Sequence, residues 1–164
     1  MNVTIEPASL EDAAEVLALQ VLAYQSEAAI YGDYTIPPLT QTLDEIEADL
    51  REQVVLEARI EERIVGSIRG HVVVGTCHVG RLIVHPDLQN RGLGTRLLRA
   101  IERACPAAQR LELFTGHRSE RNLHLYRKLG YVAFREEQVS DRLTLIFLEK
   151  YVPRAQRHAP DGER

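Results

Sequence analysis

The chain of 164 residues has no tryptophan, one methionine and only two cysteines, Cys77 and Cys105. The two cysteines form neither a metal-binding spacing nor a disulfide framework, so we expect buried or half-buried thiols. Cys105 also has no neighbour in sequence that would activate it as a nucleophile. The sequence therefore predicts no metal site and no disulfide-stabilised fold.

An excess of basic residues and a long apolar run are also absent. The formal net charge is −4 and the pI is near 5.9, which is not the charge expected of a nucleic-acid-binding protein. No apolar run approaches the ~20 residues of a membrane helix, and residues 1–7 lack a basic segment followed by an apolar one. We expect a soluble, cytoplasmic protein with one domain at 1–152 and a polar, disordered tail at 153–164.

Residues 89–94, Gln-Asn-Arg-Gly-Leu-Gly, lie between an apolar run and an amphipathic stretch, and read as strand, tight turn and helix. Two glycines at the start of a helix let an anion approach backbone N–H groups, where the helix dipole also favours negative charge. A dinucleotide fingerprint would need glycine in place of Leu97, and a P-loop would need Lys-Ser/Thr after Gly94 instead of Thr-Arg. The turn therefore predicts a phosphate site of another kind.

Hydrophobic periodicity predicts a mixed α/β fold. The segment 30–39, which contains Gly32 and two prolines, is predicted to be a stiff, exposed connection. Gly66 and Gly70 indicate a bulge in their strand or the close approach of another group. The expected strands are 2–6, 54–60, 63–73, 77–84, 110–115, 131–138 and 142–151, and the expected helices are 10–24, 43–50, 91–104 and 119–129.

Residues 82–94 resemble the acetyl-CoA signature of the GNAT acetyltransferase superfamily, whose core is Gln/Arg-x-x-Gly-x-Gly/Ala. Gln89, Gly92 and Gly94 occupy the defining positions. The order of predicted elements also matches that family across residues 2–151. The resemblance implies a mostly antiparallel central sheet flanked by helices, with one parallel, splayed strand pair beside the helix at 91–104.

Residues 119–131 resemble a later segment of the same family, and Tyr126, Gly130 and Tyr131 fall on its pattern. In many relatives the matching tyrosine protonates the departing CoA thiolate, a role that suits a phenol with a pKa near ~10. The alternative for Tyr126 is a side chain packed in the core. The chain departs from the pattern by having Ser119 where asparagine is usual, and Asn122 where a small residue is usual.

The resemblance implies acetyl-CoA as co-substrate and no metal. Arg91 and Arg96 are expected near the pyrophosphate as screening charges or as parts of a solvated helix face, and the latter is preferred for Arg99 and Arg103. A backbone N–H near Val84 is expected to polarise the thioester carbonyl. The expected cofactor-binding residues are Leu82, Ile83, Val84, Gln89, Asn90, Arg91, Gly92, Leu93, Gly94, Thr95 and Asn122.

The acceptor amine must lose a proton, and Glu112 matches a position where several relatives carry a catalytic glutamate. Its alternative is a solvent-facing residue of an alternating strand, and His85 and His117 are weaker candidates. Tyr31 and Tyr34 are expected either to form a wall of the acceptor site or to hold their loop against the body. The acidic overall charge slightly favours a cationic acceptor.

Taken with Tyr126, the resemblance predicts an N-acetyltransferase in which a primary amine, on a protein or a small molecule, attacks acetyl-CoA directly in a ternary complex. The alternative is a non-catalytic acyl-CoA-binding sensor or partner module, which would keep the glycine turn but would not need Tyr126. The sequence leaves the acceptor and the oligomeric state open, although dimers are common in such families.

Overall fold

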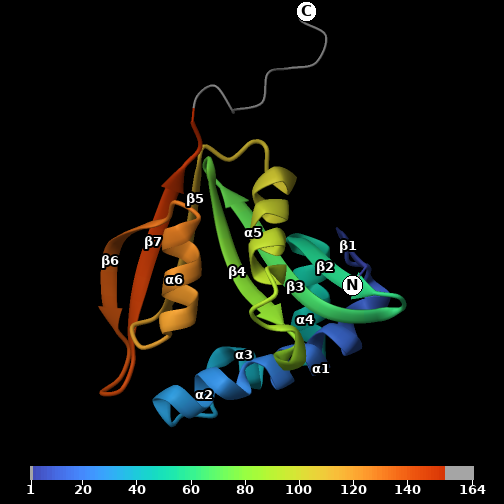
Figure 1. The fold of residues 1–164 in the computed structure, drawn as a ribbon, viewed down its shortest axis with the longest axis horizontal. Coiled ribbons are helices and arrows are strands. Elements are labelled where there is room, and N and C mark those ends of the chain that lie inside the picture. The colour runs from blue at the N-terminus through green and yellow to red at the C-terminus, as the bar shows by residue number, and fades with distance from the viewer. Residues whose placement is uncertain (1, 154–164) are drawn as a thin grey trace, which may run out of the picture.

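A computed structural model describes residues 2–153, which form a seven-stranded sheet with helices on both faces (Figure 1). The strand order is β1-β2-β3-β4-β5-β7-β6, and every neighbouring pair is antiparallel except β4/β5. This confirms the predicted mixed α/β class with a single parallel step. The strands are β1 Val3–Pro7, β2 Val54–Ile60, β3 Arg63–Val73, β4 Thr76–Val84, β5 Arg110–Gly116, β6 Val132–Gln138 and β7 Thr144–Tyr151.

The parallel pair β4/β5 is short, and its strands then separate. Only three positions pair, from Thr76↔Arg110 to His78↔Glu112, although β4 continues to Val84. Figure 1 shows the two strands diverging beyond this point. The side of β4 that faces β5 therefore has no strand partner over its second half, and its backbone groups are available to a ligand.

The helices divide between the two faces of the sheet. Helices α5 and α6 share one apolar cluster with β2–β5, whereas α1 and α4 form a second cluster on the opposite face. Short 3-10 turns precede α1 and α5. The helices are α1 Ala13–Ala23, α2 Gln25–Tyr31, α3 Pro37–Thr40, α4 Leu43–Glu52, α5 Leu93–Ala104 and α6 Glu120–Lys128, and the turns are η1 Leu10–Asp12 and η2 Pro86–Leu88.

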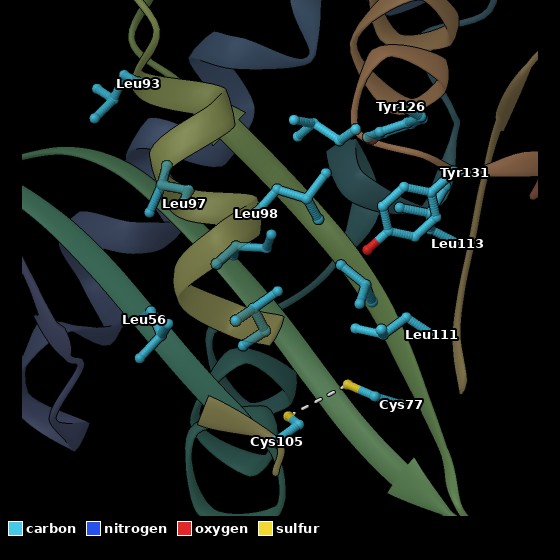
Figure 2. Packing of buried hydrophobic residues seen from close by; sticks show 14 of the residues in the cluster. Leu56, Cys77, Leu93, Leu97, Leu98, Cys105, Leu111, Leu113, Tyr126 and Tyr131 are labelled. Atoms are coloured by element: carbon cyan, nitrogen blue, oxygen red, sulfur yellow. Dashed lines mark hydrogen bonds between the residues drawn. The ribbon is translucent and has the colours of Figure 1, made fainter. Parts of the chain in front are cut away.

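The α5/α6 face contains the larger core (Figure 2). Leu97, Leu98 and Ile101 of α5 are fully buried against the strands. Gly70 permits this contact because a Cβ there would lie 2.9 Å from Cys77 Sγ and 3.0 Å from Ile101 Cγ1. The close approach predicted from the strand glycines is thus confirmed.

The N-terminal helical region differs from the prediction. The helix expected at 10–24 is a 3-10 turn followed by α1, and the chain continues into a further helix, α2, which ends at Gly32 with φ +62°. Within the predicted irregular segment, Pro37 begins the four-residue helix α3, because its fixed φ suits the first helical position. Hydrophobic periodicity did not predict α2 and α3, because neither helix is long enough to display a clear apolar stripe.

A bulge in β4 reverses its side-chain alternation. Ser67 pairs with Ile83 and Arg69 pairs with Gly80, so β4 has one residue more than β3 in this interval. Arg81 takes up the difference with φ +50°, a left-handed conformation that non-glycine residues seldom adopt. Beyond it, Leu82 packs toward the α5/α6 cluster while Ile83 joins the α1/α4 cluster.

Cys77 and Cys105 are buried free thiols, as predicted, and their sulfur atoms lie 3.3 Å apart (Figure 2). No helix among residues 2–153 is long and apolar enough to span a membrane. The predicted tail falls almost entirely outside the described residues.

Candidate functional site

The glycine turn forms an open cradle of backbone amides. Gly92 has φ +81°, and a Cβ at this position would meet no atom within 4 Å. The first backbone bond of α5 runs from Arg96 N to Gly92 O at 3.1 Å, so the preceding amides of the first turn have no intrahelical acceptor. An anion with several acceptor oxygens, such as a pyrophosphate, fits these donors.

The predicted turn residues lie together at the end of β4. The Gln89 amide donates to Val84 O at 3.4 Å and accepts a hydrogen bond from Arg121 of α6. Asn90 and Arg91 are exposed, and Asn90 has φ +63°. Arg96 donates to Val3 O of β1 at 3.2 Å, which ties its guanidinium to the sheet edge.

Leu82, Ile83 and Val84 lie in the part of β4 that has no pairing with β5. Their side chains pack into the two apolar clusters. Their side chains therefore contribute to the cores, and their contact with a ligand through the backbone stays a prediction.

Tyr126 lies on α6 and points into the α5/α6 core, with its ring 6.2 Å from that of Tyr131 (Figure 2). Its side chain is 6% exposed, and burial, reinforced by Tyr24 and Glu27, raises the pKa of its phenol. The phenol is therefore neutral throughout the physiological range. Leu125, the residue before Tyr126, lies beside Gly94 of the turn. A Cβ at Gly94 would be 3.3 Å from Leu125 Cδ2.

Glu112 lies at the last paired position of β4/β5. Its carboxylate accepts from Arg110 Nη2 at 2.8 Å and faces His78 Nδ1 at 3.7 Å. Its side chain is 18% exposed, so it is not the fully solvent-facing residue that strand alternation alone would give.

A second carboxylate, Glu27 of α2, was not predicted. It accepts from Ser119 Oγ at 2.6 Å and from Asn122 Nδ2 at 3.1 Å, and Asn122 also donates to Thr115 Oγ1 at 3.2 Å. Tyr31 Oη lies 2.7 Å from Ser119 Oγ. We call Glu27, Tyr31, Thr115, Ser119 and Asn122 the Glu27 network; it joins α2 to the end of β5 and to the start of α6.

Two positions at which the chain departs from the family pattern, Ser119 and Asn122, thus both contact Glu27. Both hydrogen bonds of Asn122 named above are donated by its side-chain nitrogen. Its side-chain oxygen is therefore left for other partners. No motif marks Glu27 itself, because its contacts lie more than 90 residues away in sequence. The sequence offered one sign that the contacts of this region differ from the family pattern, namely Ser119 at the position where asparagine is usual.

The aromatic and histidine candidates have structural contacts. Tyr31 is 4% exposed and its ring occupies the space above Gly116, which confirms that it holds its segment against the body. Tyr34 is exposed. His117 Nδ1 accepts from Thr144 N at 3.0 Å, and His85 Nδ1 accepts from Asp87 N at 3.1 Å.

The α1/α4 face contains a second unpredicted group, the Arg69 network of Gln20, Gln41, Asp49, Arg69 and Arg81. Arg69 is 3% exposed; it donates to Gln20 Oε1 at 2.7 Å and to Asp49 Oδ2 at 3.0 Å. Gln41 Oε1 accepts from Arg69 Nη1 at 3.3 Å and from Arg81 Nε at 3.4 Å. Burial lowers the pKa of Arg69 to about 10, which leaves it charged at neutral pH.

A comparison with family models matches residues 18–131 to the acetyltransferase (GNAT) family. Among curated proteins, the chain is 27% identical over 142 residues to the UPF0157 protein YqkA of Bacillus subtilis (strain 168). The match covers 87% of this chain but only 41% of YqkA.

Solved structures share the fold. The PaiA N-acetyltransferase of Thermoplasma acidophilum, in complex with coenzyme A, superposes with a TM-score of 0.78 at 16% identity, covering 93% of this chain and 100% of that one. YncA of Salmonella typhimurium, solved with acetyl-CoA, gives a TM-score of 0.74 at 20% identity and covers 99% of each chain.

Proposed function

Since the chain belongs to the acetyltransferase (GNAT) family, we propose that it transfers the acetyl group of acetyl-CoA to a primary amine by direct attack in a ternary complex. One observation carries the proposal: the unpaired half of β4 leads to the open amide turn at Gly92, and α6, which carries the buried Tyr126, lies across the separation between β4 and β5 from α5 (Figure 1).

The donor would be held by main-chain groups at two places. The amides of residues 92–95 would bind the pyrophosphate, and the free edge of β4 at 82–84 would pair with the amide-containing arm of CoA. Both contacts are to backbone atoms, so the side chains at these positions matter mainly because they must not block the approach of CoA. The bound thioester supplies the activated acetyl group.

The chain's own groups would then manage charge and protons. As the amine nitrogen bonds to the carbonyl carbon and the C–S bond breaks, an N–H near Val84 would stabilise the oxyanion and Tyr126 would pass its proton to the sulfur. Glu112 is the residue predicted to accept the amine proton, and Glu27, whose charge contributes to the raised pKa of Tyr126, is a second candidate. Direct attack suits a chain whose two thiols are buried against each other.

The test is to incubate the purified protein with acetyl-CoA and a panel of primary amines while recording free thiol. Tyr126→Phe should lower kcat by about 10²- to 10⁴-fold, the usual contribution of a general acid, with CoA affinity nearly unchanged. Tyr151→Phe removes an exposed hydroxyl from β7 and is the matched control.

Equal turnover by Tyr126→Phe and the wild type would remove Tyr126 from the mechanism. Tight CoA binding measured by calorimetry, together with no thiol release from any amine, would instead favour a non-catalytic acyl-CoA sensor.

A further inference from the structure

We propose that Cys77 and Cys105 form a site of reversible oxidation, at which a small hydroperoxide converts the two thiols into an intramolecular disulfide. Both thiols are free in the structure, and acetyl transfer by direct attack uses neither of them. The inference therefore goes beyond the proposed function and can be tested without it.

The two sulfur atoms face each other from different elements. Cys77 is the second residue of β4, and Cys105 follows the last residue of α5. The Cys77 thiol donates a hydrogen bond to Cys105 Sγ over 3.3 Å (Figure 2). Because a disulfide requires a sulfur–sulfur distance of about 2.05 Å, the two sulfurs need to approach each other by only about 1 Å.

The packing around Cys77 leaves Cys105 as its one possible partner. Cys77 is fully buried, and a Cβ at Gly70 would lie 2.9 Å from its sulfur, so the sulfur occupies the space that a side chain at position 70 would need. The chain has no third cysteine. A thiol of another molecule cannot reach Cys77 in the folded protein, so its oxidation should end in an internal bridge.

Cys105 is the thiol that meets the oxidant first. It is 5% exposed, and the two residues after it, Pro106 and Ala107, are exposed at the surface. The hydrogen bond from Cys77 lowers the pKa of Cys105, against the effect of burial, and the same bond raises the pKa of Cys77. Hydroperoxides react with thiolates, so this arrangement makes Cys105 the attacking sulfur and keeps the proton on Cys77.

The oxidation balances with the hydroperoxide as its only co-reactant. The Cys105 sulfur attacks the hydroperoxide, the O–O bond breaks, and Cys105 sulfenic acid and an alcohol form, or water when the oxidant is hydrogen peroxide. The Cys77 sulfur then attacks the sulfenic sulfur and the S–O bond breaks. The hydroxyl group leaves with the Cys77 proton as water. The two thiols lose two electrons in total, and the hydroperoxide gains them.

The bridge would close a loop that contains the segments proposed to hold CoA. Positions 77 and 105 are 28 residues apart, and residues 82–84, the glycine turn and all of α5 lie between them. Closing this loop restricts the unfolded chain and therefore stabilises the folded one. The sulfurs lie at the end of α5 and the glycine turn at its start, so we expect the oxidised protein to bind CoA as the reduced protein does.

The test treats the reduced protein with hydrogen peroxide, removes the excess with catalase and labels free thiols with N-ethylmaleimide in denaturant. The intact mass should show the loss of two hydrogens and no label, peptide mapping should find the two cysteine peptides joined, and dithiothreitol should restore both labelling sites. In urea denaturation, oxidation should lower the unfolding equilibrium constant roughly 30- to 1000-fold, the usual effect of a disulfide that closes such a loop.

The two single-cysteine variants are matched controls. Cys77→Ser should form no bridge and gain oxygen at Cys105, whereas Cys105→Ser should leave Cys77 unreacted until urea exposes it. The wild-type comparison needs no substitution, so it holds even where a variant fails to fold.

Oxygen added to the wild type without a bridge, a disulfide between two copies, or thiols that react only in urea would overturn the proposal. A loss of CoA binding on oxidation, measured by calorimetry against the reduced protein, would also contradict it. Absence of CoA binding in the reduced protein would instead reject the proposed acetyl transfer and leave the thiol chemistry to be judged by mass.

Discussion

On the α5/α6 face, the sheet is covered by closely packed leucine and isoleucine side chains, whereas the α1/α4 face combines a smaller apolar cluster with the Arg69 network. Apolar packing is non-directional, so its energy depends on volume and burial. A buried polar network instead depends on each donor meeting its acceptor. The α5/α6 face should therefore tolerate exchanges that conserve volume, whereas the α1/α4 face should tolerate few changes to its hydrogen-bonding groups.

The largest effect should come from Leu97→Ala on the α5/α6 face. Leu97 is fully buried, so we expect the free energy of unfolding to fall by about 2–5 kcal/mol, measured by urea denaturation. Leu97→Met should cost less than about 1.5 kcal/mol, because it conserves volume. Equal destabilisation of the two variants would show that the α5/α6 face depends on exact side-chain shape as strictly as the α1/α4 face depends on its hydrogen bonds.

On the α1/α4 face, Arg69→Met should lower the free energy of unfolding by about 2–3 kcal/mol, because it leaves Gln20 Oε1 and Asp49 without their charged donor. Arg69→Lys should recover little, since lysine lacks the planar fork that reaches both acceptors. Arg51→Met, an exposed α4 residue paired with Glu47, is the control and should change stability by less than about 0.5 kcal/mol. Full recovery by lysine would show that charge alone, without geometry, maintains this network.

The smallest effect should be a pH dependence arising from Glu57 on the same face. Its side chain is 1% exposed, and burial raises its pKa to about 7 from 4.5, opposed by a hydrogen bond from Arg59 Nε at 2.7 Å. The folded protein then binds more protons than the unfolded chain between these values. Stability should therefore decrease by about 1–3 kcal/mol as pH rises through that window, and level off above pH 7.

Urea denaturation at several pH values between 5 and 8 measures this slope. Glu57→Gln should flatten it, because the amide cannot ionise. Asp12, whose pKa is lowered, titrates at more acidic pH and lies outside the window. A slope that persists unchanged in Glu57→Gln would assign the dependence to other groups.

The same contrast explains how much the sequence predicts. The stripe of Leu93, Leu97 and Ile101 reveals α5 and its buried face, because a helical period is a local property. The glycine turn is likewise contiguous. The β2–β3–β4 meander and the β6/β7 hairpin also follow from short connections, and the parallel step follows from the long crossover between β4 and β5. The insertion of β7 between β5 and β6 has no such local signal.

The Arg69 and Glu27 networks escape prediction because their contacts join residues that are far apart in the sequence. The Arg69 network links positions 20, 41, 49, 69 and 81, which come from four elements and the connection between α3 and α4, and each resembles an ordinary polar residue in its own segment. The bulge that positions Arg81 has no motif beyond the neighbouring Gly80. Helix α2, which carries Glu27, is too short for its periodicity to be distinguished from the end of α1.

The bulge in β4 also has a consequence for engineering. Because β4 has one residue more than β3 across this interval, the residues that face the α5/α6 cluster are odd-numbered before Arg81 (Cys77, Val79) and even-numbered after it (Leu82, Val84). A variant with Arg81 deleted would therefore restore uniform alternation and leave Leu82 and Ile83 on the faces that they now occupy. The extra residue could thus be removed without turning the side chains of the unpaired strand edge.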